Sequence, residues 1–253
     1  PPPPPIFFLH LISFFPDPLW SRGLGDVYKR QDLSSPNRNL APLSTDIDPE
    51  GRLRVGECVL SELAQRFGTP LYVIDERSLR QACSAYREAL ERHYPGPSLA
   101  VYASKANSSL AITAVVASEG LGLDAVSAGE LLTALEGGMP PERIVLHGNN
   151  KSSEELALAV QNGVTVVVDN WHDITLLQEL AQGRTEPVAL MLRFTPGIEC
   201  HTHEYIRTGH LDSKFGFDPD QLEQVLTHLN KTTQAAGQSR ENIQEFMEAV
   251  KPF

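Results

Sequence analysis

Short apolar segments recur along the middle of this chain, and their spacing limits the fold more than any other feature. Each has the length and the β-branched or aromatic content of a buried strand. They lie near residues 99–103, 121–126, 143–147, 164–169 and 188–194. The intervals between them carry the apolar spacing of helices, and strands that alternate with helices form parallel sheets with right-handed crossovers. The near-continuous apolar character of the strands predicts that both faces of the sheet are covered.

Two parallel architectures fit this alternation, a (β/α) barrel and a doubly wound open sheet. No G-x-G-x-x-G sequence follows the first strand, which argues against a dinucleotide-binding fold. Several of the strands end in polar residues, and this repetition favours the barrel.

Further elements are predicted outside the repeat. The apolar spacing over residues 60–67 predicts a helix that ends at Gly68, and a strand is expected at residues 71–74. Helices are also expected over residues 76–93 and 219–229.

The first fifty residues differ from the rest of the chain. Residues 6–15 are apolar but too short to span a bilayer, which takes about 20 residues, and they lack the flanks of a secretory signal. The segment GDVYKRQ resembles translated adapter sequence, and residues 32–50 are rich in Ser, Pro and Asn. We therefore expect residues 1–50 to be a non-native or disordered lead-in.

The charge and the cysteines limit the class of partner. A formal net charge of -11 disfavours nucleic acid and anionic membrane, which select clustered Lys and Arg, so a small-molecule ligand is expected. Cys58, Cys83 and Cys200 are odd in number and show no C-x-x-C spacing. They indicate neither a disulfide framework nor a structural zinc site and are typical of a reducing cytoplasm.

Lys105 stands just past the end of the predicted strand at residues 99–103. In parallel α/β folds ligands bind at this end of the strands. Small neighbours leave room beside the side chain, and partial desolvation there would lower its pKa and make the amine available for a Schiff base. A surface lysine in a loop and a binder of phosphate or carboxylate remain open as alternatives.

Four other polar residues are candidates. Asp124, at a strand end, either orients a lysine or a cofactor or caps the next helix, whereas Glu130 lies in helix-forming sequence and has the pattern of a solvated residue. His147 closes a strand, and we favour stacking on a planar ligand over a bond to a backbone carbonyl. Arg193 lies in an apolar strand, so it needs an anionic partner, and we favour a functional one.

His201 and His203 form an H-x-H pair that could present two imidazoles to zinc. The pair follows a Pro-Gly loop without a second ligand pair, so a loop feature or a substrate contact is favoured. A metal-dependent hydrolase on a (β/α) barrel is the alternative function that this pair supports.

Taken together, several segments resemble the diaminopimelate decarboxylases, which belong to the alanine racemase-like, fold type III enzymes that use pyridoxal phosphate. The segments are LYVID, YASKANSS, LGLDAVSAGEL, HGNNKS, VVVDN and LRFTPGIECHTHEYIRTGHLDSKFG. They occur in the order and spacing of that family from about Gly56 to Asn230.

The resemblance implies a (β/α)8 barrel that converts meso-2,6-diaminopimelate, an amino-acid substrate, to L-lysine and CO2, and a homodimer in the complete enzyme. Lys105 would hold pyridoxal phosphate covalently, Asp124, Glu130 and His147 would line or order the cofactor site, and Arg193 would approach the side of the ring hydroxyl. Residues after Arg193 would shape substrate recognition. Alternatives within the fold are a decarboxylase of ornithine or arginine, a racemase, and a non-catalytic cofactor-binding protein.

Several features of that family are not found in this sequence. They are a sixth strand of the H-x-H-I-G-S type, a glycine-rich phosphate loop, an E-P-G-R segment and a cysteine-containing loop supplied by the neighbouring subunit. We therefore expect residues 51–230 to form an incomplete pyridoxal phosphate-binding barrel that lacks its last strands and the C-terminal β domain, and residues 231–253 to form an atypical helical tail. The polypeptide is expected to be weakly active or inactive alone.

Overall fold

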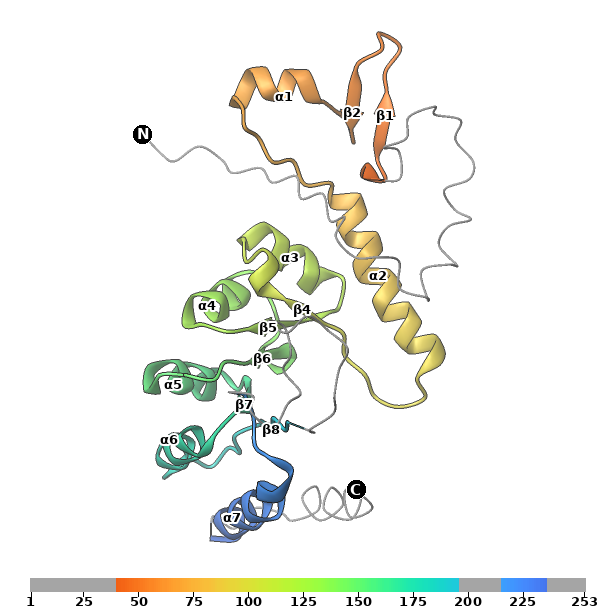
Figure 1. The fold of residues 1–253 in the computed structure, drawn as a ribbon. Helices are drawn as coiled ribbons and strands as arrows, with labels where there is room; N and C mark the ends of the chain where they lie inside the picture. The colour runs from red at the N-terminus through yellow and green to blue at the C-terminus, as the bar shows by residue number, and fades with distance from the viewer. Residues whose placement is uncertain (1–39, 196–214, 236–253) are drawn as a thin grey trace. The chain divides into compact units, whose positions relative to one another are not determined.

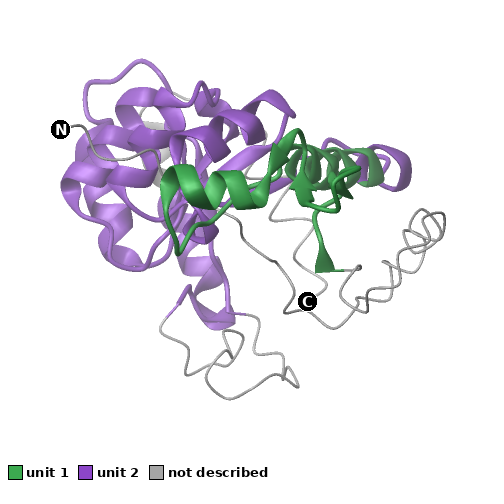
Figure 2. Cartoon of the chain, turned by 90° about the horizontal axis from the view of Figure 1, so that it is seen from above, with its two compact units in different colours: residues 1–89 green, residues 90–253 purple. Residues whose placement is uncertain are grey.

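The computed structural model describes residues 40–195 and 215–235 (Figure 1). The chain divides into two compact units, Pro1–Ala89 and Leu90–Phe253, which Figure 2 shows in green and purple. The division falls inside helix α2 (Glu76–His93), whose extent agrees with the predicted helix.

The first unit contains a small antiparallel sheet of strands in the order β1 (Thr45–Ile47), β2 (Leu53–Val55) and β3 (Cys58–Val59). Helix α1 (Leu60–Phe67) follows and ends at Gly68, as predicted. The prediction of a strand at residues 71–74 is wrong, because this segment belongs to neither of the two described sheets. Apolar composition indicates burial, whereas a strand also needs a neighbour for its backbone hydrogen bonds.

Helix α2 begins directly after Asp75, whose side chain satisfies its first turn. The Asp75 carboxylate accepts hydrogen bonds from the Ser78 N–H (3.1 Å), the Ser78 hydroxyl and the Ser44 hydroxyl (2.7 Å). Burial raises the pKa of Asp75, but the hydrogen bonds from Ser78 and then Ser44 favour the charged form more strongly. The pKa of Asp75 therefore lies below its ordinary value.

The lowered pKa of Asp75 predicts a pH-dependent contribution to stability. The contribution is complete above the pKa of an unfolded aspartate, about 3.9, and is lost as the pH falls through the lower pKa of the folded state. The Asp75→Asn variant keeps an oxygen acceptor but cannot titrate. Urea unfolding should show the parent to be more stable by about 1 kcal/mol at about pH 7 and pH 5, with a smaller difference at about pH 3. A difference that grows at pH 3 contradicts this account.

The second unit is built on a parallel sheet in which each strand pairs with the next one along the chain. Its strands are β4 (Val101–Ala103), β5 (Gly122–Ala125), β6 (Ile144–Leu146), β7 (Thr165–Val168) and β8 (Leu190–Leu192). All five lie inside the predicted apolar segments.

The helices between these strands pack one against the next along the sheet (Figure 1). They are α3 (Leu110–Ser118), α4 (Ala128–Glu136), α5 (Ser153–Asn162) and α6 (Trp171–Ala181), and α7 (Leu222–Ala235) follows later in the chain. The strand order never reverses, so right-handed crossovers place α3 to α6 on one face. A doubly wound sheet requires a reversal, so the partial (β/α) barrel is the fold class. None of the described helices has the length and apolar character to cross a bilayer.

Polar caps fix where three of these helices begin, at the edge of the sheet where the strands end. Ser127, Ser152 and Asn170 each accept a hydrogen bond from a backbone N–H in the first turn of α4, α5 and α6. At α5 the Glu155 side chain bonds back to the Ser152 N–H, which completes a capping box. These caps fix the turns that directly follow the polar residues at the strand ends.

Burial differs between the middle and the margins of the parallel sheet. Leu123, Leu146 and Val166 on the central strands are almost completely buried, whereas Val101 on β4 and Met191 on β8 are 44% and 52% exposed. Among the described residues of this unit, the prediction that both faces of the sheet are covered is therefore wrong at β4 and β8. A strand at the margin has one strand neighbour, and among the described residues helices cover one face.

The chain continues the sheet beyond β8 through a short parallel bridge between Phe194 and Phe217. The Thr195 N–H donates to the Phe217 carbonyl (2.9 Å), and the Phe217 N–H donates to the Arg193 carbonyl (2.8 Å). The buried Phe217 ring also meets Trp171 edge-on. Residues 215–217 are therefore attached to the end of β8, next to Arg193.

Candidate functional site

The polar residues of interest lie at the carboxyl ends of the parallel strands. Because neighbouring parallel strands end at the same edge of a sheet, these side chains belong to one face of the molecule. They are Lys105 after β4, Asp124 on β5, His147 after β6, Asp169 after β7 and Arg193 after β8.

Lys105 occupies the middle of the 3-10 turn η4 (Ser104–Ala106), directly past the end of β4 as predicted. The buried Ser104 hydroxyl donates to the Asp124 carbonyl (2.8 Å) and holds this turn to β5. Lys105 itself is exposed and makes no hydrogen bond or ion pair with another described residue. The described residues of its own unit therefore do not desolvate the amine, and partial desolvation of Lys105 stays a prediction.

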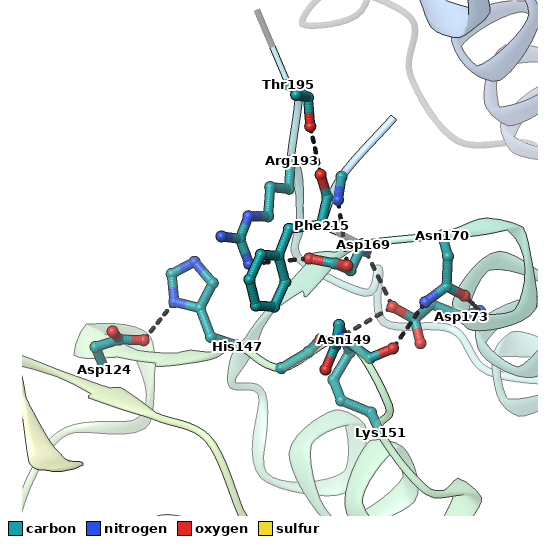
Figure 3. A network of polar contacts seen from close by, with 12 residues as sticks. Asp124, His147, Asn149, Lys151, Asp169, Asn170, Asp173, Arg193, Thr195 and Phe215 are labelled. Atoms are coloured by element: carbon teal, nitrogen blue, oxygen red, sulfur yellow. Dashed lines mark hydrogen bonds and ion pairs between the residues drawn. The ribbon is translucent and has the colours of Figure 1, made fainter. Parts of the chain in front are cut away.

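The Asp124 carboxylate contacts Nδ1 of His147, and both side chains are half-buried (Figure 3). Strands β5 and β6 are paired here, and the His147 N–H donates to the Ala125 carbonyl (2.8 Å). Asp124 therefore does not cap the next helix, because Ser127 does. The His147 ring is oriented by a carboxylate and not by a backbone carbonyl, and Nδ1 is occupied by that contact.

Glu130 lies in the first turn of α4 and is half-buried. Its carboxylate accepts a hydrogen bond from the Val126 N–H (2.7 Å), while its own N–H donates to the Ser127 hydroxyl. The Glu130 side chain therefore fixes the turn between β5 and α4, which begins at Val126, two residues after Asp124. It is not simply a solvated helix residue.

The anionic partner expected for Arg193 is Asp169, at the end of the neighbouring strand. Nη1 of Arg193 lies 3.1 Å from Oδ1 of Asp169, whose side chain is 2% exposed. The guanidinium also lies over the Phe215 ring, 4.3 Å from its centre. The second carboxylate oxygen of Asp169 accepts the Gly216 N–H (3.2 Å), so Asp169 connects Arg193 to the segment beyond β8 (Figure 3).

A buried ion pair beneath these residues was not among the predicted site residues. Nζ of Lys151 lies 2.7 Å from Oδ2 of Asp173, and the two side chains are 2% and 1% exposed. Lys151 follows β6 and Asp173 lies in the first turn of α6, so the pair joins two different strand-helix units. The position of Lys151 in a polar segment after a strand could have indicated a functional residue. Local sequence spacing does not identify Asp173 as its partner.

The proposed metal ligands His201 and His203 lie outside the described residues. Within residues 40–195 and 215–235, no group of three or more His, Cys, Asp or Glu side chains is arranged to hold a metal ion.

The residues at this edge have the chemistry to hold an anionic, planar cofactor that carries an aldehyde. The Lys105 amine can condense with an aldehyde. The imidazole of His147 and the guanidinium of Arg193 are both planar, and each is oriented by a carboxylate of the neighbouring strand. The donor set therefore fits such a group.

Comparison with known families places the same residues in a cofactor-binding domain. Residues 76–236 match the family described as pyridoxal-dependent decarboxylase, pyridoxal binding domain. The diaminopimelate decarboxylase of Synechocystis is 52% identical over 203 residues, which are 77% of this chain and 43% of that protein. The diaminopimelate decarboxylase of Bacillus subtilis is 46% identical over 169 residues, which are 66% of this chain and 38% of that protein. The chain spans less than half the length of these curated relatives.

Solved structures have the same architecture over the matched part. Diaminopimelate decarboxylase from M. jannaschii superposes with a TM-score of 0.66 and 34% identity, over 74% of this chain and 44% of that chain. The enzyme from Helicobacter pylori, complexed with L-lysine, gives a TM-score of 0.63 and 32% identity, over 68% and 43%. A second M. jannaschii structure, with a TM-score of 0.65, also contains L-lysine.

Proposed function

This chain belongs to the pyridoxal-dependent decarboxylases, in the diaminopimelate decarboxylase group, and from that premise we propose that the full-length protein removes CO2 from meso-2,6-diaminopimelate to give L-lysine. The observation that carries the proposal is the position of Lys105 on the turn after β4. That turn lies inside the matched pyridoxal-binding domain and at the same sheet edge as His147 and Arg193.

Five residues are proposed to serve the cofactor. Lys105 provides the amine that binds it, while His147 and Arg193 provide an oriented imidazole and a guanidinium. Asp124 orients His147, and Glu130 fixes the turn that follows Asp124. When bound, pyridoxal phosphate takes up the electron pair that CO2 leaves behind. The work of the chain is to hold these groups in place and to orient the carboxylate that is lost.

The choice of substrate is supported by what the solved relatives contain. L-lysine is bound in the M. jannaschii and Helicobacter pylori enzymes, and it differs from diaminopimelate by one carboxylate. The proposed substrate therefore carries a second amino-acid end, which distinguishes it from ornithine and arginine. Discrimination is expected to depend on polar groups that pair with that end, since unpaired buried groups reject analogues that lack it.

The proposal is tested by measuring CO2 release from diaminopimelate, ornithine, arginine and alanine side by side with the full-length protein and added pyridoxal phosphate. We expect diaminopimelate to be turned over with a kcat on the order of 1 to 1,000 per second and the others at least about 100-fold more slowly. Faster release from ornithine or arginine would assign a different decarboxylase. Cofactor absorbance without CO2 release from any of them would indicate a racemase or a non-catalytic binding protein.

A further inference from the structure

We propose that the buried ion pair of Lys151 and Asp173 is a positioning element that fixes His147 and Arg193 relative to each other. The inference rests on the proposed function, because it concerns two residues assigned there to the cofactor. Neither Lys151 nor Asp173 is itself proposed to contact the cofactor. Both are almost completely buried, and their charged atoms lie 2.7 Å apart.

The pair is poorly suited to a purely stabilising role. Removing two charges from water is costly, and the cost is offset only when the remaining donors and acceptors are also satisfied. Oδ1 of Asp173 is buried and accepts no hydrogen bond from another described residue. A buried acceptor without a partner destabilises the fold, so burial alone does not explain why the pair is present.

The first set of contacts, which we call one arm of the ion pair, connects Lys151 to the turn that follows His147. Nζ of Lys151 donates to the Gly148 carbonyl, in the turn that begins at the end of β6. Gly148 has a φ of 118°, a conformation that residues with a side chain rarely adopt, so this turn has a defined shape. The Asn170 side chain donates to the Asn149 carbonyl (3.2 Å) and provides a second connection between this turn and the start of α6.

The other arm leads to Arg193. Oδ2 of Asp173 accepts the Asp169 N–H (3.0 Å), at the end of β7. The Asp169 carboxylate in turn holds the guanidinium of Arg193 and the Gly216 N–H. The backbone of Asp169 is thus fixed by the same carboxylate that binds Lys151.

Oδ2 of Asp173 is the atom at which the two arms meet (Figure 3). This oxygen accepts hydrogen bonds from Nζ of Lys151, which lies between β6 and α5, and from the N–H of Asp169, which follows β7. A shift of this oxygen therefore changes the support of His147 and of Arg193 together. Displacement of catalytic groups by about 1 Å is enough to cost about 100-fold in rate.

The decisive variant replaces both charges by apolar side chains, Lys151→Met with Asp173→Leu. Each single change should lower the unfolding temperature, because it leaves one buried charge unpaired, and the double change should recover most of that loss. The double variant still cannot donate to the Gly148 carbonyl or accept the Asp169 N–H. We therefore expect its kcat to remain about 100-fold below that of the parent.

Amide hydrogen exchange provides a readout that does not depend on turnover. In the protein without cofactor, residues 147–150 and 215–217 should exchange faster in the double variant than in the parent, although its unfolding temperature has recovered. Val116→Ala, in the buried face of α3, is the matched control for a loss of stability alone. It should leave kcat unchanged and should not raise exchange in these two segments relative to the rest of the parallel sheet.

The proposal would be overturned if the double variant recovered kcat and slow exchange as well as stability. The ion pair could then be replaced by apolar side chains without loss of function. If the double variant does not fold, the Asp173→Glu variant tests the positioning role instead. It keeps the charge but moves the carboxylate, so we expect faster exchange in both segments and a kcat at least about 10-fold lower. An unchanged kcat and unchanged exchange in that variant would equally overturn the role. A parent protein that releases no CO2 contradicts the proposed function, whereas the exchange comparison still tests the coupling.

Discussion

Replacing Lys105 by alanine is expected to lower the rate of decarboxylation by at least about 1,000-fold, because the amine that binds the cofactor is lost. The visible absorbance of the lysine-bound cofactor should disappear with it. Stability should change by less than about 0.5 kcal/mol, because Lys105 is exposed and the buried Ser104 continues to hold the turn to β5. Enzyme assays, absorbance spectra and urea unfolding of the same preparation check all three.

Two controls separate this role from that of a simple anion-binding lysine. Lys105→Arg keeps the positive charge but offers no amine for condensation, so it should be as inactive as the alanine variant. A binder of phosphate or carboxylate would instead retain much of its activity with arginine. Borohydride reduction of the parent followed by peptide mapping should label residue 105. A label on Lys151 or any other lysine would reject the assignment.

The largest effect on stability is expected from Gly122→Ala, at the start of β5. A Cβ atom there would lie 2.3 Å from the Arg143 carbonyl and 3.0 Å from the side chains of Leu99 and Val101. The Arg143 carbonyl is backbone and cannot rotate away, so β5 and the chain entering β6 must move apart. We expect a loss of about 3 kcal/mol or more in the free energy of unfolding, measured by urea denaturation.

Gly129→Ala is the matched control within the same strand-helix unit. The nearest atom to a Cβ at Gly129 is the Ser127 hydroxyl at 4.0 Å, so the methyl group has room. Gly129 is the second residue of α4, and alanine is preferred over glycine by up to about 1 kcal/mol in a helix interior and by less in the first turn. The control should be neutral or slightly more stable than the parent. Equal losses in the two variants would show that the close approach at Gly122 is relieved without cost.

The parallel sheet could be predicted from the sequence because its determinants are local. Each strand is a short apolar run and each intervening helix has its own apolar spacing, so neither depends on a distant partner. The segment at residues 71–74 has the same apolar character but is a strand of neither described sheet. Exposure of Val101 and Met191 could not be predicted either, since it depends on which strands are marginal.

The candidate site could be predicted as a set of positions but not as a set of contacts. Lys105, Asp124, His147 and Arg193 all follow from the rule that strand ends converge at one edge. Their partners come from neighbouring strands, so the contact of Asp124 with His147 and the role of Asp169 become visible only in three dimensions. The Lys151–Asp173 pair was missed for the same reason, because no local pattern connects its two members.

The one-directional strand order has a consequence for how this unit is made on the ribosome. Each strand pairs with the one synthesised immediately before it, so a newly emerged segment finds its neighbour already present. Partners in successive strands are separated by only one strand-helix unit, so the entropy cost of closing the loop is smaller than for pairing with a more distant strand. The sheet can therefore be assembled stepwise during translation, in the direction from β4 to β8, without waiting for a distant part of the polypeptide.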